Sequence, residues 1–495
     1  MARTPPGTAP GLSGYAYALD VTPCPTEHVP VQSQPSPRRS RQLMEDAVGN
    51  DRPWPGGPPS KGRSGALAQL RRDRLHFLKH CADEYGDFVP FRLGQRQVVY
   101  LNRADYVETV ISKGGDAYSK NYLTDFFHPI LRQQLLLSDT GSWLEQRRVA
   151  QPALRPDRLP AYARVMVERA DAMVSDWSEG QTLDVSERMR RLTLEILARS
   201  LFDVDIAREA AETGDIVDRV LEDVNQRANG RAFVPFVLPT PANLRLLRIL
   251  KRLDFLLDRL ISDRRLDAAG RKDLLSMMVT SAEDGGHGFD NDETKLTALP
   301  LFFAGHETTA VTLTWTLLLL SRHPEVADRV RTEIEEVLGE RLPEPDDVRS
   351  LRYLNWVVQE ALRLYPPIWG FGREAMQDTQ IDSYTIPKGT TVFMSQWVLQ
   401  RDRRYFDRPE EFDPERWSDG LAGRLPRGAY VPFGLGSRRC LGNVFALTEA
   451  VLVLATICRR FNLQALSPED PPMDPLITLR PHGPVPMRVE SRPVD

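Results

Sequence analysis

The chain has 495 residues, a formal net charge of −4 and 41% hydrophobic residues. Such a chain can bury a large core, and a near-neutral charge without a basic stripe argues against nucleic-acid binding. Its four cysteines, Cys24, Cys81, Cys440 and Cys458, form neither a CxxC pair nor an evenly spaced framework. This usage argues against a zinc ribbon or a disulfide scaffold and suits a reducing compartment.

The first 60 residues are rich in Pro, Gly and Ser and end in Pro53-Trp-Pro-Gly-Gly-Pro-Pro59. This composition predicts a disordered leader that becomes extended where it meets the folded body. The leader has no apolar core of a signal peptide and no run of about 20 apolar residues. We therefore expect a leader over 1–60, one domain over 61–495, no transmembrane segment, and a monomeric, cytoplasmic protein.

From residue 64 onward the apolar spacing is mostly helical. Pro300 lies inside one predicted helix and should bend it. The segment 401–433 is broken by four prolines and is expected to be irregular. The pattern predicts a mainly α (α+β) chain with small β-sheets. Helices are expected over 67–85, 159–177, 186–202, 242–265, 293–322 and from just after Cys440 to about 461, and short strands over 88–92, 98–101, 385–394 and 476–489.

The most specific pattern is Phe433-Gly-Leu-Gly-Ser-Arg-Arg-Cys-Leu-Gly442. A sulfur that binds a metal must be ionised, which the N-terminus of the following helix favours. The glycines let the loop approach a flat cofactor, and Arg438 offers a cation to an anionic group. The alternative is a structural cysteine in a glycine-rich turn. Cys24, Cys81 and Cys458 lack such surroundings, and Cys458 is expected to be a core residue.

This decapeptide resembles the haem-binding signature of the cytochrome P-450 superfamily, in its soluble bacterial type. The resemblance covers roughly residues 60–490. It implies a single large helix-rich fold with haem b between the long central helix and the helix after the cysteine loop. It implies that the thiolate of Cys440 binds the iron and favours cleavage of the O–O bond of O2, the co-substrate. Cofactor contacts are implied for Phe433, Gly434, Arg438 and Gly442.

A second motif, Ala304-Gly-His-Glu-Thr-Thr309, lies within the predicted helix 293–322. An acid and an alcohol inside a helix are unfavourable unless water or a ligand uses them, although a polar face of a surface helix is the alternative. Such a pair can relay protons to reacting oxygen. The resemblance implies catalytic roles for Glu307 and Thr308, cofactor contact for Ala304 and, at Gly305, room for O2. His306 is expected to be a helix residue with a partner close by in the chain. Thr309 is expected to serve in packing.

Glu360 and Arg363 lie on one helical face at spacing i, i+3, where most such pairs are surface ion pairs of little weight. They resemble the ExxR pair of the family, with Arg416 as third member of a structural triad that fixes the irregular segment. The family usually has Phe where this chain has Trp417, a departure that we expect to leave the triad untouched.

Trp143 and Arg147 lie at spacing i, i+4, which by itself suggests a surface cation–π contact. The resemblance implies instead that both bind one haem propionate. It implies that Arg373 reaches the other propionate.

The resemblance implies a monooxygenase that inserts one oxygen atom from O2 into a substrate, and epoxidation, desaturation or ring coupling use the same chemistry. No G-x-G-x-x-G follows a strand, so electrons from NAD(P)H should arrive through a separate ferredoxin or flavodoxin with its reductase. We expect this partner to dock near Arg424, Arg427 and Arg439. A haem-binding sensor without turnover is the alternative from another class, and the acid–alcohol pair argues against it. A helical interaction scaffold that binds no haem is a third, more distant alternative.

The substrate is expected to be lipophilic, because the positions that line the pocket of the family fold are apolar or aromatic here. Fatty acid, terpenoid, steroid-like and polyketide substrates all fit, and ordinary core packing is the alternative for each residue. The candidates are Phe302, Phe303, Ile368, Trp369, Phe371, Leu476 and Ile477, with the loop 122–127 and the link 233–239.

Overall fold

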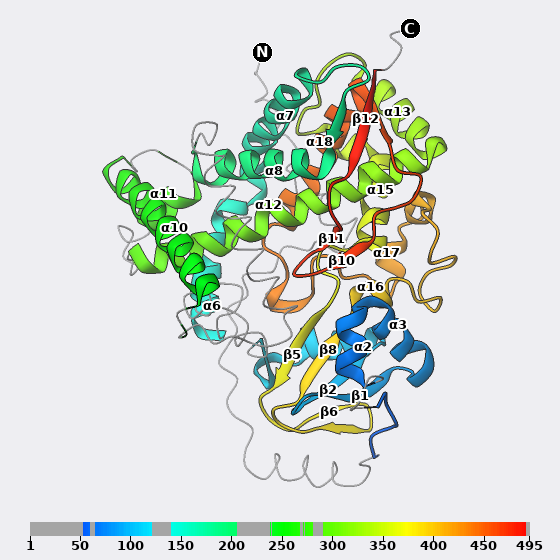
Figure 1. Ribbon diagram of the computed structural model, residues 1–495. Coiled ribbons are helices and arrows are strands. Elements are labelled where there is room, and N and C mark those ends of the chain that lie inside the picture. Colours follow the sequence, from blue (N-terminus) through cyan, green and yellow to red (C-terminus); the bar gives the residue numbers. More distant parts are fainter. Residues whose placement is uncertain are drawn as a thin grey trace, which may run out of the picture.

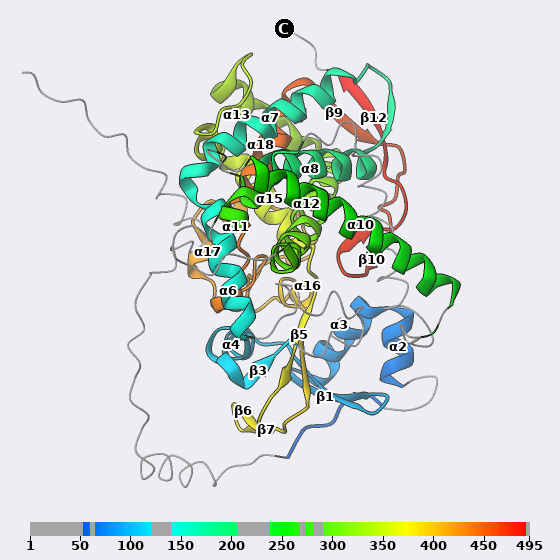
Figure 2. The same ribbon diagram turned by 90° about the vertical axis from the view of Figure 1, so that its left-hand side faces the viewer.

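The computed structural model describes residues 53–59, 65–120, 140–204, 238, 240–267, 271, 273–280 and 291–491. The loop 122–127, most of the link 233–239 and most of the leader lie outside the described residues. Figure 1 shows helices in the upper part and the largest sheet at the lower end, and Figure 2 keeps that order after a 90° turn. Within the described chain, no helix combines the length and the apolar character that crossing a bilayer requires.

The helices follow the expected pattern closely, with one break. The expected helix 67–85 is two helices, because Asp73 is extended and its carboxylate accepts a hydrogen bond from the backbone N–H of His76 at 3.0 Å. Asp73 is thus an N-cap, which starts a new helix. The helices are α2 (Ala66–Arg72), α3 (Arg74–Tyr85), α4 (Ala104–Glu108), α6 (Thr140–Ala150), α7 (Leu159–Ser175), α8 (Val185–Phe202), α10 (Pro241–Leu266), α11 (Leu274–Thr280), α12 (Asn291–Arg322), α13 (Pro324–Leu338), α14 (Asp347–Ser350), α15 (Arg352–Leu364), α16 (Gln396–Leu399), α17 (Leu421–Arg424) and α18 (Asn443–Arg460).

Short 3-10 helices and a π-helix (η2) join these elements. They are η2 (Thr109–Lys113), η3 (Gly115–Ala117), η5 (Gln151–Leu154), η6 (Pro156–Arg158), η8 (Pro414–Trp417) and η9 (Gly436–Arg438).

The largest sheet has five strands in the order β1-β2-β8-β5-β3, with β2 and β8 parallel and the other pairs antiparallel. A three-stranded sheet has the order β4-β12-β9, and β6-β7 and β10-β11 are hairpins. The expected strand 385–394 is two strands separated by a turn at Gly389, where φ is +81°. The strands are β1 (Phe88–Leu93), β2 (Arg96–Leu101), β3 (Tyr118–Ser119), β4 (Thr182–Asp184), β5 (Phe371–Ala375), β6 (Thr379–Ile381), β7 (Tyr384–Ile386), β8 (Thr391–Met394), β9 (Phe461–Ala465), β10 (Met473–Pro475), β11 (Leu479–Pro481) and β12 (Pro486–Ser491).

Helix α12 is the centre of the helical part (Figure 1) and lies against α8, α15 and α18. Its C-terminal half is buried on every face from Thr309 to Leu320, which is why its sequence there is apolar all round with threonines that bond within the helix. Pro300 lies inside α12, and the helix continues through it from Asn291 to Arg322. A bend at Pro300 stays a prediction.

The last residues of the expected leader belong to the folded body. The Trp54 ring meets Phe88 edge to face at 5.7 Å between centroids, and its indole N–H donates to the carbonyl of Thr385 at 2.7 Å. A side chain on Gly57 would collide with the Pro90 carbonyl oxygen. Residues 53–59 therefore dock on the large sheet, so the folded part begins before residue 61.

Candidate active site

The cysteine loop, residues 433–442, includes η9 and leads into α18. A hydrogen bond from the backbone N–H of Cys440 to the carbonyl of Phe433 at 2.8 Å closes it. Gly434 and Gly436 have φ values of +71° and +67°, and a side chain on Gly436 would come within 2.8 Å of the Ile111 carbonyl oxygen. Both glycines are therefore required by the backbone. They present the sulfur of Cys440 on a tight loop just before a helix.

Cys440 is an exposed residue. Protein atoms nevertheless surround its thiol closely enough to remove it from bulk water. Burial raises its pKa, and this effect outweighs the lowering by the Gly442 N–H and by the charges of Arg147 and Arg439. The N–H groups at the start of the helix thus favour the thiolate as expected, but the effect of burial, which favours the neutral thiol, is larger. The charge of a bound metal ion is what would keep such a sulfur ionised.

Two guanidinium groups flank the buried ring of Trp143. The Arg438 carbon lies 4.6 Å and the Arg147 carbon 5.5 Å from the ring centre. Arg147 also donates to the carbonyl of Arg439 at 2.8 Å. The pair Trp143 and Arg147 is thus not a solvated surface contact, since it fastens α6 to the cysteine loop.

A third and a fourth cation join Arg438. Arg373 on β5 donates to the carbonyl of Gly372 at 2.7 Å. Lys120, just after β3, has its pKa lowered to about 7 by burial and by the charges of Arg373 and Arg438. A buried lysine with two guanidinium groups close enough to repel it forms a place that suits an anionic group. Sequence reasoning missed Lys120, because no motif surrounds it and the long-range sheet pairing brings it here.

The acid–alcohol motif lies on α12. Thr308 donates to the carbonyl of Ala304 at 2.9 Å, and the buried carboxylate of Glu307 accepts a hydrogen bond from Thr478 at 3.1 Å. His306 has the expected local partner, with its Nδ1 2.9 Å from the carbonyl oxygen of Phe302. A side chain on Gly305 would meet Leu197 of α8 at 2.6 Å. Close packing of α8 on α12 therefore accounts for this glycine, and the room for O2 at Gly305 stays a prediction.

Comparisons with known proteins agree with this geometry. Residues 55–485 match the family model "Cytochrome P450". The chain belongs to the cytochrome P450 family. Cyclooctatin synthase of Streptomyces melanosporofaciens is 37% identical over 415 residues, which are 83% of this chain and 90% of that protein. Cyclooctat-9-en-7-ol 5-monooxygenase of the same organism is 35% identical over 446 residues, covering 89% and 96%.

Pentalenene oxygenase of Streptomyces avermitilis is 32% identical over 418 residues, which are 83% of this chain and 90% of that protein. The solved heme domain of a cytochrome P450DA mutant superimposes with a TM-score of 0.78 at 27% identity, covering 89% of this chain and 98% of the other. The mainly α P450 fold is thus confirmed. This P450 is an oxidoreductase of the monooxygenase class, which uses haem iron and O2.

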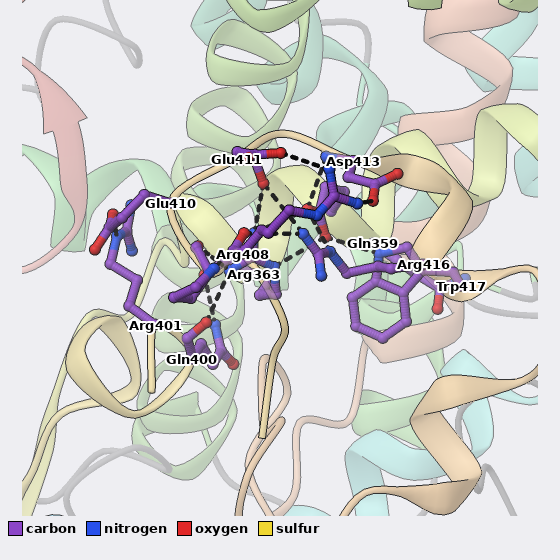
Figure 3. Close-up of polar contacts among 12 residues, drawn as sticks. Gln359, Arg363, Gln400, Arg401, Arg408, Glu410, Glu411, Asp413, Arg416 and Trp417 are labelled. Carbon is purple, nitrogen blue, oxygen red and sulfur yellow. Dashed lines mark hydrogen bonds and ion pairs between the residues drawn. The ribbon is translucent and has the colours of Figure 1, made fainter. Parts of the chain in front are cut away.

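The ExxR pair of this P450 is a fully buried ion pair, and Figure 3 shows Arg363 and Arg416 among the polar residues of the irregular segment. Arg363 donates to both carboxylate oxygens of Glu360 at 2.9 and 2.8 Å, and Arg416 donates to the same carboxylate at 2.9 Å. Arg363 also donates to the carbonyls of Gln400, Pro409 and Glu411. The geometry thus ties the irregular segment to α15, as the triad was expected to do.

Trp417 takes part in this network, contrary to our expectation. Its indole N–H donates to Glu360 Oε2 at 2.9 Å, and the backbone N–H of Asp413 donates to Oε1 at 3.0 Å. The carboxylate of Glu360 therefore receives donors from two arginines, an indole and the backbone. Phenylalanine at 417 would lack one of these donors.

The expected pocket residues fall into different clusters. Phe303 and Ile477 pack together with leucines of α10. Phe302 packs instead against Phe202 of α8, with ring centres 5.6 Å apart, since successive helix residues point about 100° apart. Trp369 is buried in a cluster that includes residues of α3, and Phe371 on β5 packs against the cluster formed around β2 and β8. Phe302, Trp369 and Phe371 thus have packing partners in other clusters, and the pocket role of all seven residues, including the half-buried Ile368 and Leu476, stays a prediction.

A buried acid on α18 escaped the sequence reasoning. Burial raises the pKa of Glu449 well above its ordinary value, and neighbouring Thr309 lowers it by less. Burial therefore favours the neutral form of the Glu449 carboxyl in the folded protein. The signal was available, because Glu449 stands within the otherwise apolar run from Phe445 to Leu454 apart from Thr448.

Replacing Glu449 with Gln should remove a pH-dependent destabilisation. Burial raises the pKa of this carboxyl in the folded protein, whereas in the unfolded chain the carboxyl ionises above about pH 4.3. As far as this carboxyl is concerned, the folded protein is thus stable to the full extent below that pH. As the pH rises toward the raised pKa of folded Glu449, the free energy of unfolding falls by about 1.4 kcal/mol per pH unit. Thermal unfolding should show the wild type losing stability relative to Glu449→Gln between about pH 5 and 7. Exposed Glu336→Gln is the control, and parallel profiles for Glu449→Gln would refute a neutral Glu449.

Proposed function

We propose that this P450 holds haem b through Cys440 and through the cations that gather beside it. The observation that carries the proposal is a cysteine on a glycine-built loop whose Arg438, together with Arg373, lies close enough to the buried Lys120 to repel it. A metal bound by thiolate and a pair of propionates satisfy both features. When bound, the haem supplies the chemistry of O2 reduction and substrate oxidation.

The residues of α12 are proposed to hold and move protons. The Thr308 hydroxyl gives its hydrogen to the carbonyl of Ala304, which leaves its oxygen free to accept a hydrogen bond from water. The carboxyl of Glu307 can donate or accept a proton according to its ionisation. Together with water the two side chains form a relay from the interior of α12 to the site where oxygen reacts.

The proposed substrate is a terpenoid, and the proposed reaction is hydroxylation. Phe303 and Ile477 offer an apolar wall with Leu299 of α12 and leucines of α10, which suits a ligand with few polar groups. Relatives are named for the oxidation of pentalenene and of cyclooctat-9-en-7-ol. Fatty acids, steroid-like compounds and polyketides are less well supported, and epoxidation, desaturation or ring coupling remain the alternative outcomes.

Electrons are proposed to come from NAD(P)H through a ferredoxin or a flavodoxin with its reductase, in the cytoplasm, to a monomeric P450. The docking surface we propose contains Arg424, Arg427 and Arg439. Arg424 is exposed on α17, and Arg427 lies 3.7 Å from Glu108, so part of its charge is already offset. An acidic partner is expected to bind here less tightly as salt is added.

Thr308→Ala is expected to separate O2 consumption from product formation. With a ferredoxin, its reductase and NADPH, and pentalenene as the probe substrate, the variant should consume O2 but release peroxide. Product per electron pair should fall by about 100-fold, the lower end of the usual contribution of a positioned acid–base group. Glu307→Gln should also lower the product per electron pair and raise the release of peroxide.

The control for this experiment is Thr314→Val, since Thr314 is also buried in α12 and bonds only to the carbonyl of Ala310 among the described residues. Unchanged coupling in Thr308→Ala would count against the relay. Failure of both the ferredoxin and a flavodoxin to reduce the wild type, or reduction without salt dependence, would count against the proposed partner and surface.

A further inference from the structure

The β10–β11 hairpin is fastened to three separate parts of the P450. The indole N–H of Trp315 on α12 donates to the carbonyl of Leu479 at 2.8 Å, and the indole N–H of Trp369 donates to the carbonyl of Leu476 at 2.8 Å. Arg74 of α3 donates to the carbonyl of Pro475 at 2.7 Å. The hairpin beside α12 in Figure 1 is therefore a fixed element and not a loose tail.

Thr478 lies in the turn of this hairpin and is 5% exposed. Its hydroxyl donates to Glu307 Oε1 at 3.1 Å, across 171 residues of sequence. Within the described part of the chain, no other side chain hydrogen-bonds this carboxyl. A buried carboxyl with one side-chain donor takes its position from that donor, because leaving it without one is strongly unfavourable.

The neighbour of Thr478 faces the proposed pocket. Ile477 packs against the buried cluster formed by Leu299 of α12 with Leu246, Leu250 and Leu253 of α10, and Phe303 of α12 packs against the same cluster. Consecutive residues of one anchored turn thus contact the apolar wall and the acid of α12. The turn connects the place where substrate would bind with the group proposed to deliver protons.

We propose that Thr478 is a positioning residue that holds the Glu307 carboxyl in place for proton delivery. The inference rests on the proposed role of Glu307. Nothing in the sequence motifs marks Thr478, since it follows two apolar residues in the tail of the chain. Its assignment comes from the geometry of the hairpin.

The test is Thr478→Val, which keeps the size and removes the hydroxyl, beside Thr478→Ser, which keeps the hydroxyl. In the reconstituted system with pentalenene as the probe, product per electron pair should fall about tenfold in Thr478→Val, the effect of a lost hydrogen bond to a charged group. Peroxide should rise in proportion, and Thr478→Ser should restore coupling. The control is Thr456→Val, at a buried threonine of α18 that bonds within its own helix at 2.7 Å.

The double variant Glu307→Gln with Thr478→Val separates this inference from the proposed function. If both residues act as one unit, the double variant should couple no worse than Glu307→Gln alone. Unchanged coupling in Glu307→Gln would sink the proposed role of Glu307 itself. Loss in Glu307→Gln but full coupling in Thr478→Val would sink the inference alone.

A crystal structure of Thr478→Val gives a readout that does not depend on turnover. The Glu307 carboxyl should leave its present position, whereas a carboxyl that stays in place would overturn the inference. Thr478→Ala serves the same comparison if the valine variant does not fold. Coupling that falls equally in Thr478→Ser would also overturn it, because packing and not the hydroxyl would then be responsible.

Discussion

The reduced wild-type protein with carbon monoxide should show the strongly red-shifted Soret band of thiolate-ligated haem, and Cys440→His should lose it. A thiolate from Cys440 would donate electron density to the haem iron that an imidazole does not. Product formation should fall below about 1% of wild type, because the same electron donation favours O–O cleavage. The difference spectrum and turnover with pentalenene measure both effects.

Cys458→Ala is the matched control, since Cys458 lies on α18 beyond the same loop and is half-buried. It should retain the thiolate band. A histidine-type band in freshly prepared wild-type protein would show that Cys440 is not the ligand.

Glu360→Ala should destabilise the protein by about 3–5 kcal/mol, the usual effect of removing one partner from a buried ion pair. The pair with Arg363 is 0% exposed on both sides, so Ala at 360 removes the carboxylate that accepts from two guanidinium groups and an indole and leaves the buried Arg363 charge without its counter-ion. This is a large part of the total stability of a domain. We expect little folded protein that takes up haem, measured by denaturant unfolding and by haem content.

Two variants sharpen this result. Arg408→Ala is the control, because Arg408 is exposed and pairs with Glu411 and Asp413 at the surface of the same segment, where such pairs contribute little. Trp417→Phe removes one donor to Glu360 and should cost about 1–3 kcal/mol. Equal unfolding free energies for Glu360→Ala and Arg408→Ala would contradict the structural role of the triad.

Local patterns were sufficient for most of the helices and for the cysteine loop. The apolar spacing placed α7, α8, α10, α12 and α18 to within a few residues at each end, because a helix buries one face and repeats every 3.6 residues. The loop around Cys440 was recognisable because its glycines and its cysteine are needed within ten consecutive residues. The same holds for the acid–alcohol pair, whose members are adjacent in the chain.

Other features depended on contacts between distant segments. A helical pattern runs through Asp73, and its capping role appears only from its extended backbone and the bond to His76. Phe302 and Phe303 are equally apolar, yet only their directions on α12 send one toward α8 and the other toward α10. Gly305 is explained by Leu197, a residue more than 100 positions away.

The sequence by itself thus determined the family, the helical architecture, and the cysteine and acid–alcohol pair that mark the chemistry. The tertiary structure alone decided which groups meet them: Lys120 beside Arg373 and Arg438, Trp417 on Glu360, and Thr478 on Glu307. The physical reason is that hydrogen bonds and charge interactions act over a few ångströms. Residues separated by tens or hundreds of positions meet at that range only when the chain has folded.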